Sequence, residues 1–350
     1  MTPEVSAIVV SHRSAAEAAG CVASLASSFR AEGISGETIL VDCGSGKEEE
    51  RALREAGSDS LVLLEENRGY SGGVNAGLAA ARGRNLLLCN ADVVFSPGAL
   101  AALVRAVGDK RVGAAAPLAF WDSGERVKLP PGYAPGFFTD LAQLLGGRSR
   151  ALDDSRFARF ARSATRLWER GGTAKQLAGA VLAARRDVFD AAGRFDERYP
   201  FEYEETEWEA RVRRAGFDLL FVPDGRIRHL WAVSSSRNPG TAARRAASEA
   251  RYRSRYGRLG RAFLERASLL ARNGTESASA IEPSFEARPG AAVAVSPNPS
   301  GIPFAAADLD RAFRLPAEIS ARLAAGRWRF TVFRKEDGRP LETRVWEKGE

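Results

Sequence analysis

Cysteine, histidine and long apolar runs are scarce in this sequence. Its 350 residues include three cysteines and two histidines, and Cys21, Cys43 and Cys89 lack the spacing typical of a metal site. We expect all three to be small buried side chains in a protein from a reducing compartment. No apolar run approaches the roughly 18 residues of a membrane-spanning helix, and no signal peptide is recognised. We therefore expect a cytoplasmic protein, at most peripheral to the inner face of a membrane.

Basic residues exceed acidic ones. The chain has 51 lysines and arginines against 44 acidic residues, a formal net charge of +7. This excess favours an anionic partner, and the charge alone does not choose among a nucleotide diphosphate, a lipid phosphate and a membrane surface. No nucleic-acid recognition module accompanies the charge, so we expect no nucleic-acid partner.

Short apolar runs alternate with helical stretches in the first half of the chain. The runs at 5–11, 38–42, 61–64 and 86–88 have the β-branched and leucine-rich character of strands buried on both faces. Strands that alternate with helices of ten or more residues predict right-handed crossovers and a mostly parallel, Rossmann-like sheet with helices on both faces. The sequence therefore predicts an α/β fold.

A glycine-rich segment at residues 67–77 precedes the strand at 86–88. We expect its glycines to allow positive φ and close approach to a ligand, and the helix that begins near Ser71 to offer free N–H groups to an anion. Asn90 and Asp92 follow the strand, at the sheet edge where ligands bind in α/β proteins. A lone Asp there predicts Mg²⁺ or Mn²⁺, with diphosphate oxygens and water as further ligands.

An acidic cluster occupies residues 202–209. It contains five glutamates within eight residues, and their mutual repulsion is expected to raise at least one pKa, as a general base requires. Glu204 and Glu205 also begin an amphipathic helix, so a purely structural role beside the helix dipole stays open.

Two segments resemble a known family. Residues 67–95, NRGYSGGVNAGLAAARGRNLLLCNADVVF, are similar to the N-x-G-x-x-x-G-x-N-x-G segment and the following N-P-D or D-x-D turn of glycosyltransferase family 2, especially its rhamnosyltransferase-like branch. Residues 179–216 resemble the acceptor region of the same family, with Glu204 and Glu205 on its E-D pair. The likeness covers about residues 4–268 and implies an A-type glycosyltransferase fold.

The resemblance also implies roles for individual residues. Glu205 is the expected base, with Glu204 as the substitute, and Asp92 and His229 are the expected metal ligands. Asp42 is expected to contact the nucleobase, and Gly179, Ala180 and Glu207 are expected in the acceptor site. The expected donor-binding residues are Ser11, His12, Arg13, Asp42, Asn67, Arg68, Gly69, Gly73, Asn75, Asn90 and Ala91.

The second half of the chain predicts several further parts. We expect a catalytic domain at 1–240 with a long loop at 121–150, a basic helical tail at 241–272, a linker at 273–301 and a small β-rich module at 302–350 that contains a hairpin. The tail either lies on an anionic membrane surface or is a solvated basic face. A serine run at 234–236 follows His229, and the pattern of the resembled family also has a serine after this histidine.

These features predict an inverting glycosyltransferase. It would move a sugar from a UDP- or dTDP-linked donor to a hydroxyl of a glycan or lipid-linked acceptor in cell-surface polysaccharide synthesis. Two alternatives stay open. A sugar-1-phosphate nucleotidyltransferase shares the strand pattern but not the N-terminal glycine loop, and a catalytically silent sugar-nucleotide or glycan-binding protein would explain why the turn at 90–92 carries one carboxylate.

Overall fold

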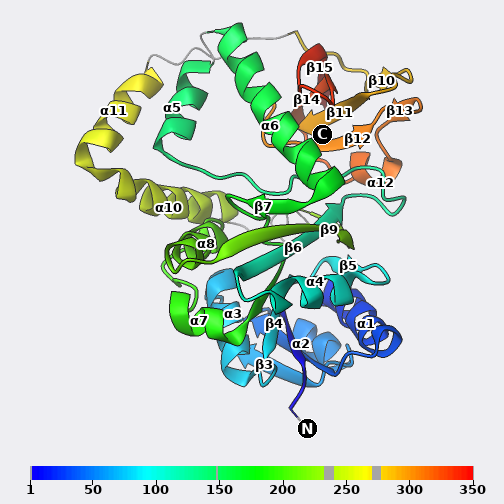
Figure 1. Ribbon diagram of the computed structural model, residues 1–350, viewed down its shortest axis with the longest axis vertical. Coiled ribbons are helices and arrows are strands. Elements are labelled where there is room, and N and C mark those ends of the chain that lie inside the picture. The colour runs from blue at the N-terminus through cyan, green and yellow to red at the C-terminus, as the bar shows by residue number, and fades with distance from the viewer. Residues whose placement is uncertain (1, 147–148, 232–239, 270–276, 350) are drawn as a thin grey trace. The chain divides into compact units, whose positions relative to one another are not determined.

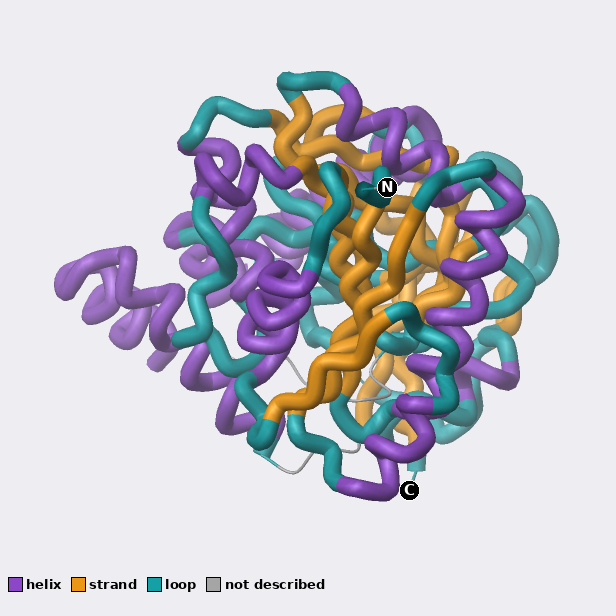
Figure 2. The backbone as a smooth tube through the Cα atoms, turned by 90° about the horizontal axis from the view of Figure 1, so that it is seen from below, coloured by secondary structure: helices purple, strands orange, loops and turns teal. Residues whose placement is uncertain are grey.

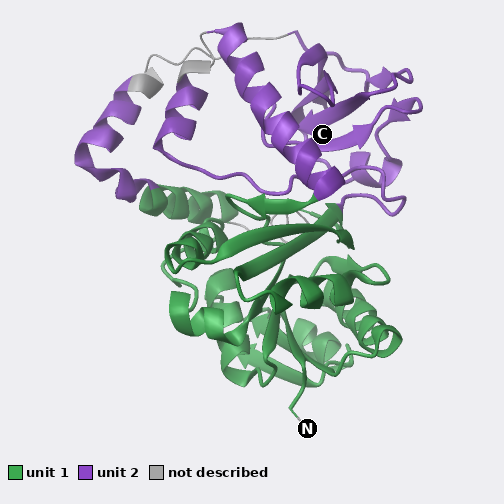
Figure 3. Cartoon of the chain, viewed as in Figure 1, with its two compact units in different colours: residues 1–119, 171–252 green, residues 120–170, 253–350 purple. Residues whose placement is uncertain are grey.

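A computed structural model describes residues 2–146, 149–231, 240–269 and 277–349. The chain forms two compact units (Figure 3). Unit 1 comprises residues 1–119 and 171–252, and unit 2 comprises residues 120–170 and 253–350. The serine run at 234–236 lies outside the described residues.

Four parallel strands form the first half of the sheet in unit 1. Their order is β3-β2-β1-β4 (Figure 1), with β1 at Val5–Ser11, β2 at Gly36–Cys43, β3 at Ser60–Leu64 and β4 at Asn85–Asn90. The connecting helices are α1 (Ala15–Glu32), α2 (Lys47–Arg54) and α3 (Gly69–Ala80). Helices lie on both sides of the long strands in Figure 2. The predicted α/β fold with a parallel core is confirmed.

Antiparallel strands continue the sheet beyond β4. The order runs on as β8-β6-β9-β5, and β7 also pairs with β9. The strands are β5 (Val93–Phe95), β6 (Val112–Phe120), β7 (Gly172–Ala174), β8 (Val181–Arg185) and β9 (Asp218–His229). The remaining helices of this unit are α4 (Ala99–Gly108), α7 (Arg186–Ala192), α8 (Glu204–Arg214) and α10 (Thr241–Arg253). Pairing of β5 with β9 brings two distant segments together directly after β4.

Two glycines of α3 are required for packing. A Cβ at Gly73 would lie 2.5 Å from Val10 and 2.9 Å from the sulfur of Cys43, and one at Gly77 would lie 2.3 Å from Ile8. Both glycines thus let the helix approach β1 and β2. Strand side chains occupy the space beside Gly73 and Gly77, so packing accounts for glycine at both positions, and the donor-binding role of Gly73 stays a prediction.

Gly69 is the glycine of this segment that has a positive φ, +72°. A Cβ there would lie 2.7 Å from the carbonyl oxygen of Pro200. The start of α3 is therefore fitted closely against the chain that leads into α8, which is where the acidic cluster lies.

Replacement of Gly77 by alanine is expected to lower the free energy of unfolding by about 1–3 kcal/mol, because the new methyl group overpacks the contact with Ile8. Gly20 provides the control, since it lies inside α1 with no atom within 4 Å of a built Cβ. Gly20→Ala should instead be neutral or stabilising by up to about 1 kcal/mol, because alanine favours a helix. Urea unfolding of both variants checks this, and equal destabilisation would contradict the packing role.

Unit 2 contains an antiparallel sheet of order β12-β11-β14-β15 and a pair of short strands, β10 and β13. The strands are β10 (Ser284–Phe285), β11 (Ala291–Ser296), β12 (Ala305–Asp308), β13 (Phe313–Arg314), β14 (Gly326–Arg334) and β15 (Pro340–Lys348). The helices of the unit are α5 (Phe137–Gly146), α6 (Arg150–Arg170), the short η1 (Ser254–Tyr256), α11 (Gly257–Leu269) and α12 (Ala317–Ser320). Phe157 of α6 stacks on Phe304, with ring centroids 5.0 Å apart, and lies edge-on to Phe333 of the sheet.

The domain boundaries predicted from the sequence need correction. The expected linker at 273–301 contains β10 and the fully buried β11, and the expected loop at 121–150 contains the whole of α5. The hairpin is confirmed by the pairing of β14 with β15. The basic tail divides between the units, since residues up to 252 belong to unit 1. In the described part of the chain, no helix is both long enough and apolar enough to cross a membrane.

Candidate active site

The carboxyl ends of β1 and β2 are joined by side-chain hydrogen bonds. The His12 ring nitrogen Nδ1 lies 2.7 Å from the carbonyl oxygen of Cys43, and the Arg13 backbone N–H donates to Ser45 Oγ at 2.8 Å. Ser11, the last residue of β1, is buried with its hydroxyl 3.0 Å from that of Ser14. Residues 11–13 thus lie at one edge with the 42–45 turn, as predicted.

Asp42 shapes the turn that follows β2. Its carboxylate accepts hydrogen bonds from Ser45 Oγ at 2.5 Å and from the Ser45 backbone N–H at 3.1 Å. Asn67 acts similarly at the start of α3, because its Oδ1 accepts the Gly69 N–H at 2.9 Å. Both side chains lie at the expected edge and are engaged in shaping it. Their contact with a donor stays a prediction.

Asp92 and His229 meet across the pairing of β5 with β9. Asp92 Oδ1 lies 3.2 Å from His229 Nε2, and both residues are buried. Asn90 completes the group, with its Nδ2 3.5 Å from the same nitrogen, and buried Ala91 lies between the two turn residues in sequence. A carboxylate oxygen and an imidazole nitrogen at this separation fit two positions around one divalent cation. In the described ranges, no three or more His, Cys, Asp or Glu side chains are grouped so that they could hold a metal ion, so further ligands would be substrate and water.

The loop at 176–180 connects this turn to the acidic cluster. The Asn90 N–H donates to the carbonyl oxygen of Ala180 at 2.9 Å. A Cβ on Gly179 would lie 2.9 Å from Cγ of Glu205, so glycine lets the loop pass directly beside that side chain. Glu209 holds the loop from α8, since its carboxylate accepts the Leu177 N–H at 3.1 Å. Glu205 and the Asp92 turn are therefore brought close by one short loop.

The five glutamates of the acidic cluster have separate environments. Glu202 pairs with Arg245 at 2.5 Å, Glu207 pairs with Arg211 at 2.9 Å, and Glu209 accepts from Leu177. Glu204 is buried, and its Oε2 has no hydrogen-bond partner. The other residue of the pair, Glu205, is half-buried. These two adjacent carboxyl groups are the members of the cluster suited to proton transfer.

Burial perturbs both carboxyl groups. Desolvation raises the pKa of Glu205 to about 7, and the negative charge of Glu202 adds to the shift. Desolvation together with the charge of Glu205 raises the pKa of Glu204 well above its usual value. Glu205 thus titrates in the range where a general base is most effective, whereas Glu204 holds its proton more strongly.

The turn before α8 is strained and is held by α10. Glu202 and Tyr203 have φ values of +62° and +69°, which are costly for residues other than glycine. Within unit 1, Ser248 Oγ accepts the Phe201 N–H at 3.2 Å, and the ring of Tyr252 lies 5.1 Å from that of Tyr203. The first part of the basic tail therefore fixes the position of the acidic pair.

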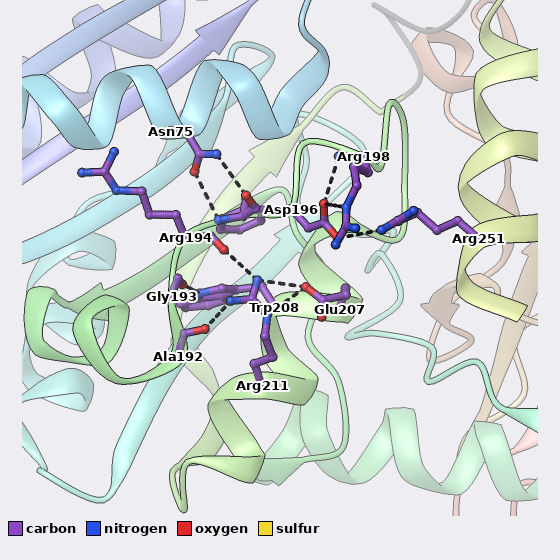
Figure 4. A network of polar contacts seen from close by, with 11 residues as sticks. Asn75, Ala192, Gly193, Arg194, Asp196, Arg198, Glu207, Trp208, Arg211 and Arg251 are labelled. Carbon is purple, nitrogen blue, oxygen red and sulfur yellow. Dashed lines mark hydrogen bonds and ion pairs between the residues drawn. The ribbon is translucent and has the colours of Figure 1, made fainter. Parts of the chain in front are cut away.

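Two predicted site residues have structural roles in the network of Figure 4. Asn75 donates to the carbonyl oxygen of Phe195 and accepts its N–H, at 3.0 and 3.1 Å. Glu207 orients Arg211, whose guanidinium donates to the carbonyl oxygens of Ala192 and Arg194. The geometry thus favours a framework role for Asn75 over donor binding, and for Glu207 over acceptor binding.

Glu207→Gln is expected to lower the free energy of unfolding by about 1–3 kcal/mol, because the charge-assisted contact with Arg211 is lost. The acceptor concentration that gives half of the maximal transfer rate should change little in this variant. Glu347→Gln provides a control, since Glu347 pairs with Arg327 at 3.1 Å where both side chains are about half exposed, and such pairs contribute little. A raised acceptor KM with unchanged stability would instead support the acceptor role.

Three polar side chains lie at the start of α3. Arg68, predicted in the donor site, pairs with Glu197 at 2.5 Å. The motif gave no reason to select Tyr70 or Ser71, yet Tyr70 Oη and Ser71 Oγ are buried and have no hydrogen-bond partner. In the sequence, the one feature that could have indicated these two residues is their position next to the glycines of the loop. Buried unpaired hydroxyls at the start of α3 are groups that a polar ligand would satisfy.

Comparison with known proteins gives a family match. Residues 6–168 match the family described as Glycosyl transferase family 2. This match covers just under half of the chain. The resemblance to this family that was predicted from the sequence is confirmed, and the α/β architecture agrees with the predicted fold class.

Two curated relatives are similar to this chain. Both are N-acetylglucosaminyl-diphospho-decaprenol L-rhamnosyltransferases, from Mycobacterium tuberculosis strains CDC 1551 / Oshkosh and ATCC 25618 / H37Rv, and each is 27% identical over 161 residues. The match covers 45% of this chain, and the chain spans about half the length of these relatives, 50%. This similarity confirms the resemblance to rhamnosyltransferase-like members of the family.

Two solved structures are also similar to this chain. One is GalNAc-T7 with UDP, GalNAc and Mn²⁺, at 18% identity and a TM-score of 0.47, covering 65% of this chain and 44% of that one. The other is the mannosyltransferase PcManGT from Pyrobaculum calidifontis in complex with GDP-Man and Mn²⁺. It has 15% identity and a TM-score of 0.47, and the match covers 77% and 81% of the two chains.

Proposed function

We propose that this chain is an inverting, metal-dependent glycosyltransferase. It moves a sugar from a nucleotide-diphosphate donor to a hydroxyl of a glycan or lipid-linked acceptor in cell-surface polysaccharide synthesis. One observation carries the proposal: in a chain whose residues 6–168 match family 2, the loop at 176–180 joins Glu205, a half-buried carboxyl group, to the turn that holds Asp92.

Asp92 and His229 would hold the metal. The carboxylate suits Mg²⁺ or Mn²⁺, and because Mg²⁺ sites consist mainly of oxygen ligands, an imidazole nitrogen 3.2 Å away favours Mn²⁺. When bound, the metal offsets negative charge on the departing diphosphate. Asn90 and Ala91 form the turn that presents Asp92, and Asn90 is fixed by its hydrogen bond to Ala180.

Glu205 would take the proton of the acceptor hydroxyl. Its pKa of about 7 lets it be ionised near neutral pH and still be basic enough to accept a proton. The hydroxyl then attacks the anomeric carbon opposite the leaving diphosphate, so a single displacement inverts the configuration. Glu204, whose pKa is raised further, keeps its proton and reduces repulsion beside the base.

The donor and acceptor are assigned by class. The relatives named above are N-acetylglucosaminyl-diphospho-decaprenol L-rhamnosyltransferases, which supports a lipid-linked acceptor here. The donor we propose is a UDP- or dTDP-linked sugar. We place the enzyme in the cytoplasm, peripheral to the inner face of the membrane. The edge formed by residues 11–13, Asp42 and Asn67 would receive the nucleotide.

Donor turnover tests the proposal. Purified protein with Mn²⁺ is incubated with UDP- or dTDP-linked sugars, with and without lipid-linked glycan acceptors, and the released nucleoside diphosphate is measured. We expect release that depends on acceptor and metal. A silent binder would retain the nucleotide without release, and a nucleotidyltransferase would instead form pyrophosphate from a nucleoside triphosphate and a sugar phosphate.

A further inference from the structure

The exposed apolar side chains of unit 2 concentrate on two helices. In the described ranges, six large hydrophobic residues are exposed, and three of them lie on α5 and α11. Leu259 is 88% exposed, Phe138 81% and Phe263 54%. Such side chains are usually scattered singly over a surface, so their concentration on one helix pair requires an explanation.

The three side chains belong to one continuous apolar face. Leu259 and Phe263 are four residues apart on α11 and therefore share a side of the helix. Phe137 joins them to α5, because its ring centroid lies 6.3 Å from that of Phe263 and 5.4 Å from that of Phe138. The helices α5 and α11 lie side by side within unit 2 (Figure 1). We call Phe138, Leu259 and Phe263 the apolar face of this helix pair.

Basic residues surround the apolar face. α11 carries exposed arginines at 258, 261 and 266 against one exposed acid, Glu265. Arg266 is three residues beyond Phe263, on the same side of the helix. The single acidic residue of α5, Asp140, is paired with Arg253 at 2.9 Å. The apolar face therefore lies in a surface of net positive charge.

We propose that the apolar face of α5 and α11 docks on an anionic lipid bilayer. Large apolar side chains that project beside arginines are typical of helices that lie in the membrane interface, with apolar groups inserted among the acyl chains and cations near the lipid phosphates. A protein partner is disfavoured, because three side chains supply far less than the roughly 800 Å² per partner of a stable interface. The proposal rests on the proposed function only in that a lipid-linked acceptor would be found at such a surface.

Vesicle co-sedimentation of the full chain tests this surface. The vesicles are phosphatidylcholine alone and phosphatidylcholine mixed with phosphatidylglycerol. We expect binding to the mixed vesicles that weakens as salt rises, because exposed charges are screened. The triple variant Phe138→Ser, Leu259→Ser, Phe263→Ser should lower the partition coefficient at least about tenfold. The variants Arg258→Glu and Arg261→Glu should each lower it by roughly fivefold or more.

Two controls match these variants. Ile281 is 79% exposed and lies outside the helix pair, so Ile281→Ser should bind vesicles as the unchanged protein does. Arg288 is likewise exposed and remote in sequence, so Arg288→Glu should have less effect than either α11 variant. Circular dichroism of each variant verifies folding.

Several outcomes would overturn the inference. One is no binding to mixed vesicles, and another is equal binding by the triple variant and the unchanged protein. A concentration-dependent dimer that the triple variant abolishes, without vesicle binding, would show that a second copy covers the face. The assay uses no donor, so vesicle binding without sugar transfer would preserve this inference and remove the proposed function, and transfer to a soluble acceptor without vesicle binding would do the reverse.

Discussion

Glu205→Gln is expected to lower the rate of sugar transfer by about 10²–10⁴-fold, the usual effect of removing a general base. Donor binding should persist, because glutamine keeps the shape of the side chain beside Gly179. Single-turnover transfer and donor thermal stabilisation, measured on the same preparation, separate the two effects. Loss of both together would show that Glu205 supports the fold of the site instead of acting as its base.

The pH dependence follows from the raised pKa of Glu205, about 7. Activity requires the ionised carboxylate, so kcat/KM should rise with pH through about 7 and then level. Because the folded-state pKa lies above the unfolded value of about 4.3, ionisation weakens folding as pH rises through the folded value. Above pH 7, the free energy of unfolding of Glu205→Gln should therefore exceed that of the unchanged protein. Catalytic residues often lower stability in this way.

Glu204→Gln is the matched comparison. Glu204 is expected to be protonated at neutral pH, since its pKa is raised well above the usual value, and a neutral glutamine resembles that form. We expect this variant to keep most of its activity and a similar pH profile, because glutamine is neutral like the protonated Glu204 and leaves the burial of Glu205 unchanged. A loss in Glu204→Gln equal to that in Glu205→Gln would reverse the assignment of the base.

Asp92→Ala is expected to lower transfer by at least about a hundredfold and to remove the dependence on Mn²⁺. The carboxylate is buried and faces His229, so its loss leaves one side-chain ligand at the turn. Since a metal supplies several kcal/mol of charge stabilisation, the rate should fall accordingly. Transfer rates measured across a Mn²⁺ titration check this.

Asp224→Ala is the control for that variant, because Asp224 is exposed on β9, the strand that carries His229. It should leave both the rate and the metal dependence unchanged. His229→Ala should raise the Mn²⁺ concentration needed for half-maximal activity, with a smaller effect on the maximal rate. A full rate in Asp92→Ala would remove the metal site from this turn.

Local patterns predicted the parallel core well. The run at 5–11 coincides with β1, and the run at 38–42 lies within β2, because strands buried on both faces need continuous apolar residues. The strand β11 was missed, since its sequence of alanine, valine and serine follows a proline- and serine-rich stretch. Its burial depends on pairing with β12 and β14, which are distant in sequence.

The sequence predicted which residues form the candidate site but not which partners their side chains contact. The motif indicated Asp92 and the acidic pair, and pairing of β5 with β9 brings His229 to Asp92. Sequence could not separate the five glutamates, because Arg245 and Leu177, the partners of Glu202 and Glu209, lie on other segments. Nor could it show that Gly73 packs against Val10, since a glycine that packs and a glycine that binds look alike in one sequence.

Thermal unfolding with nucleoside diphosphates tests the central claim most directly. The unchanged protein and Asp92→Ala are heated with UDP, dTDP or GDP, each with and without Mn²⁺. A ligand at 100 times its Kd should add about 2.7 kcal/mol to stability. The account predicts stabilisation by UDP or dTDP that requires Mn²⁺ and disappears in Asp92→Ala. Absence of stabilisation by every diphosphate, with and without metal, would contradict it.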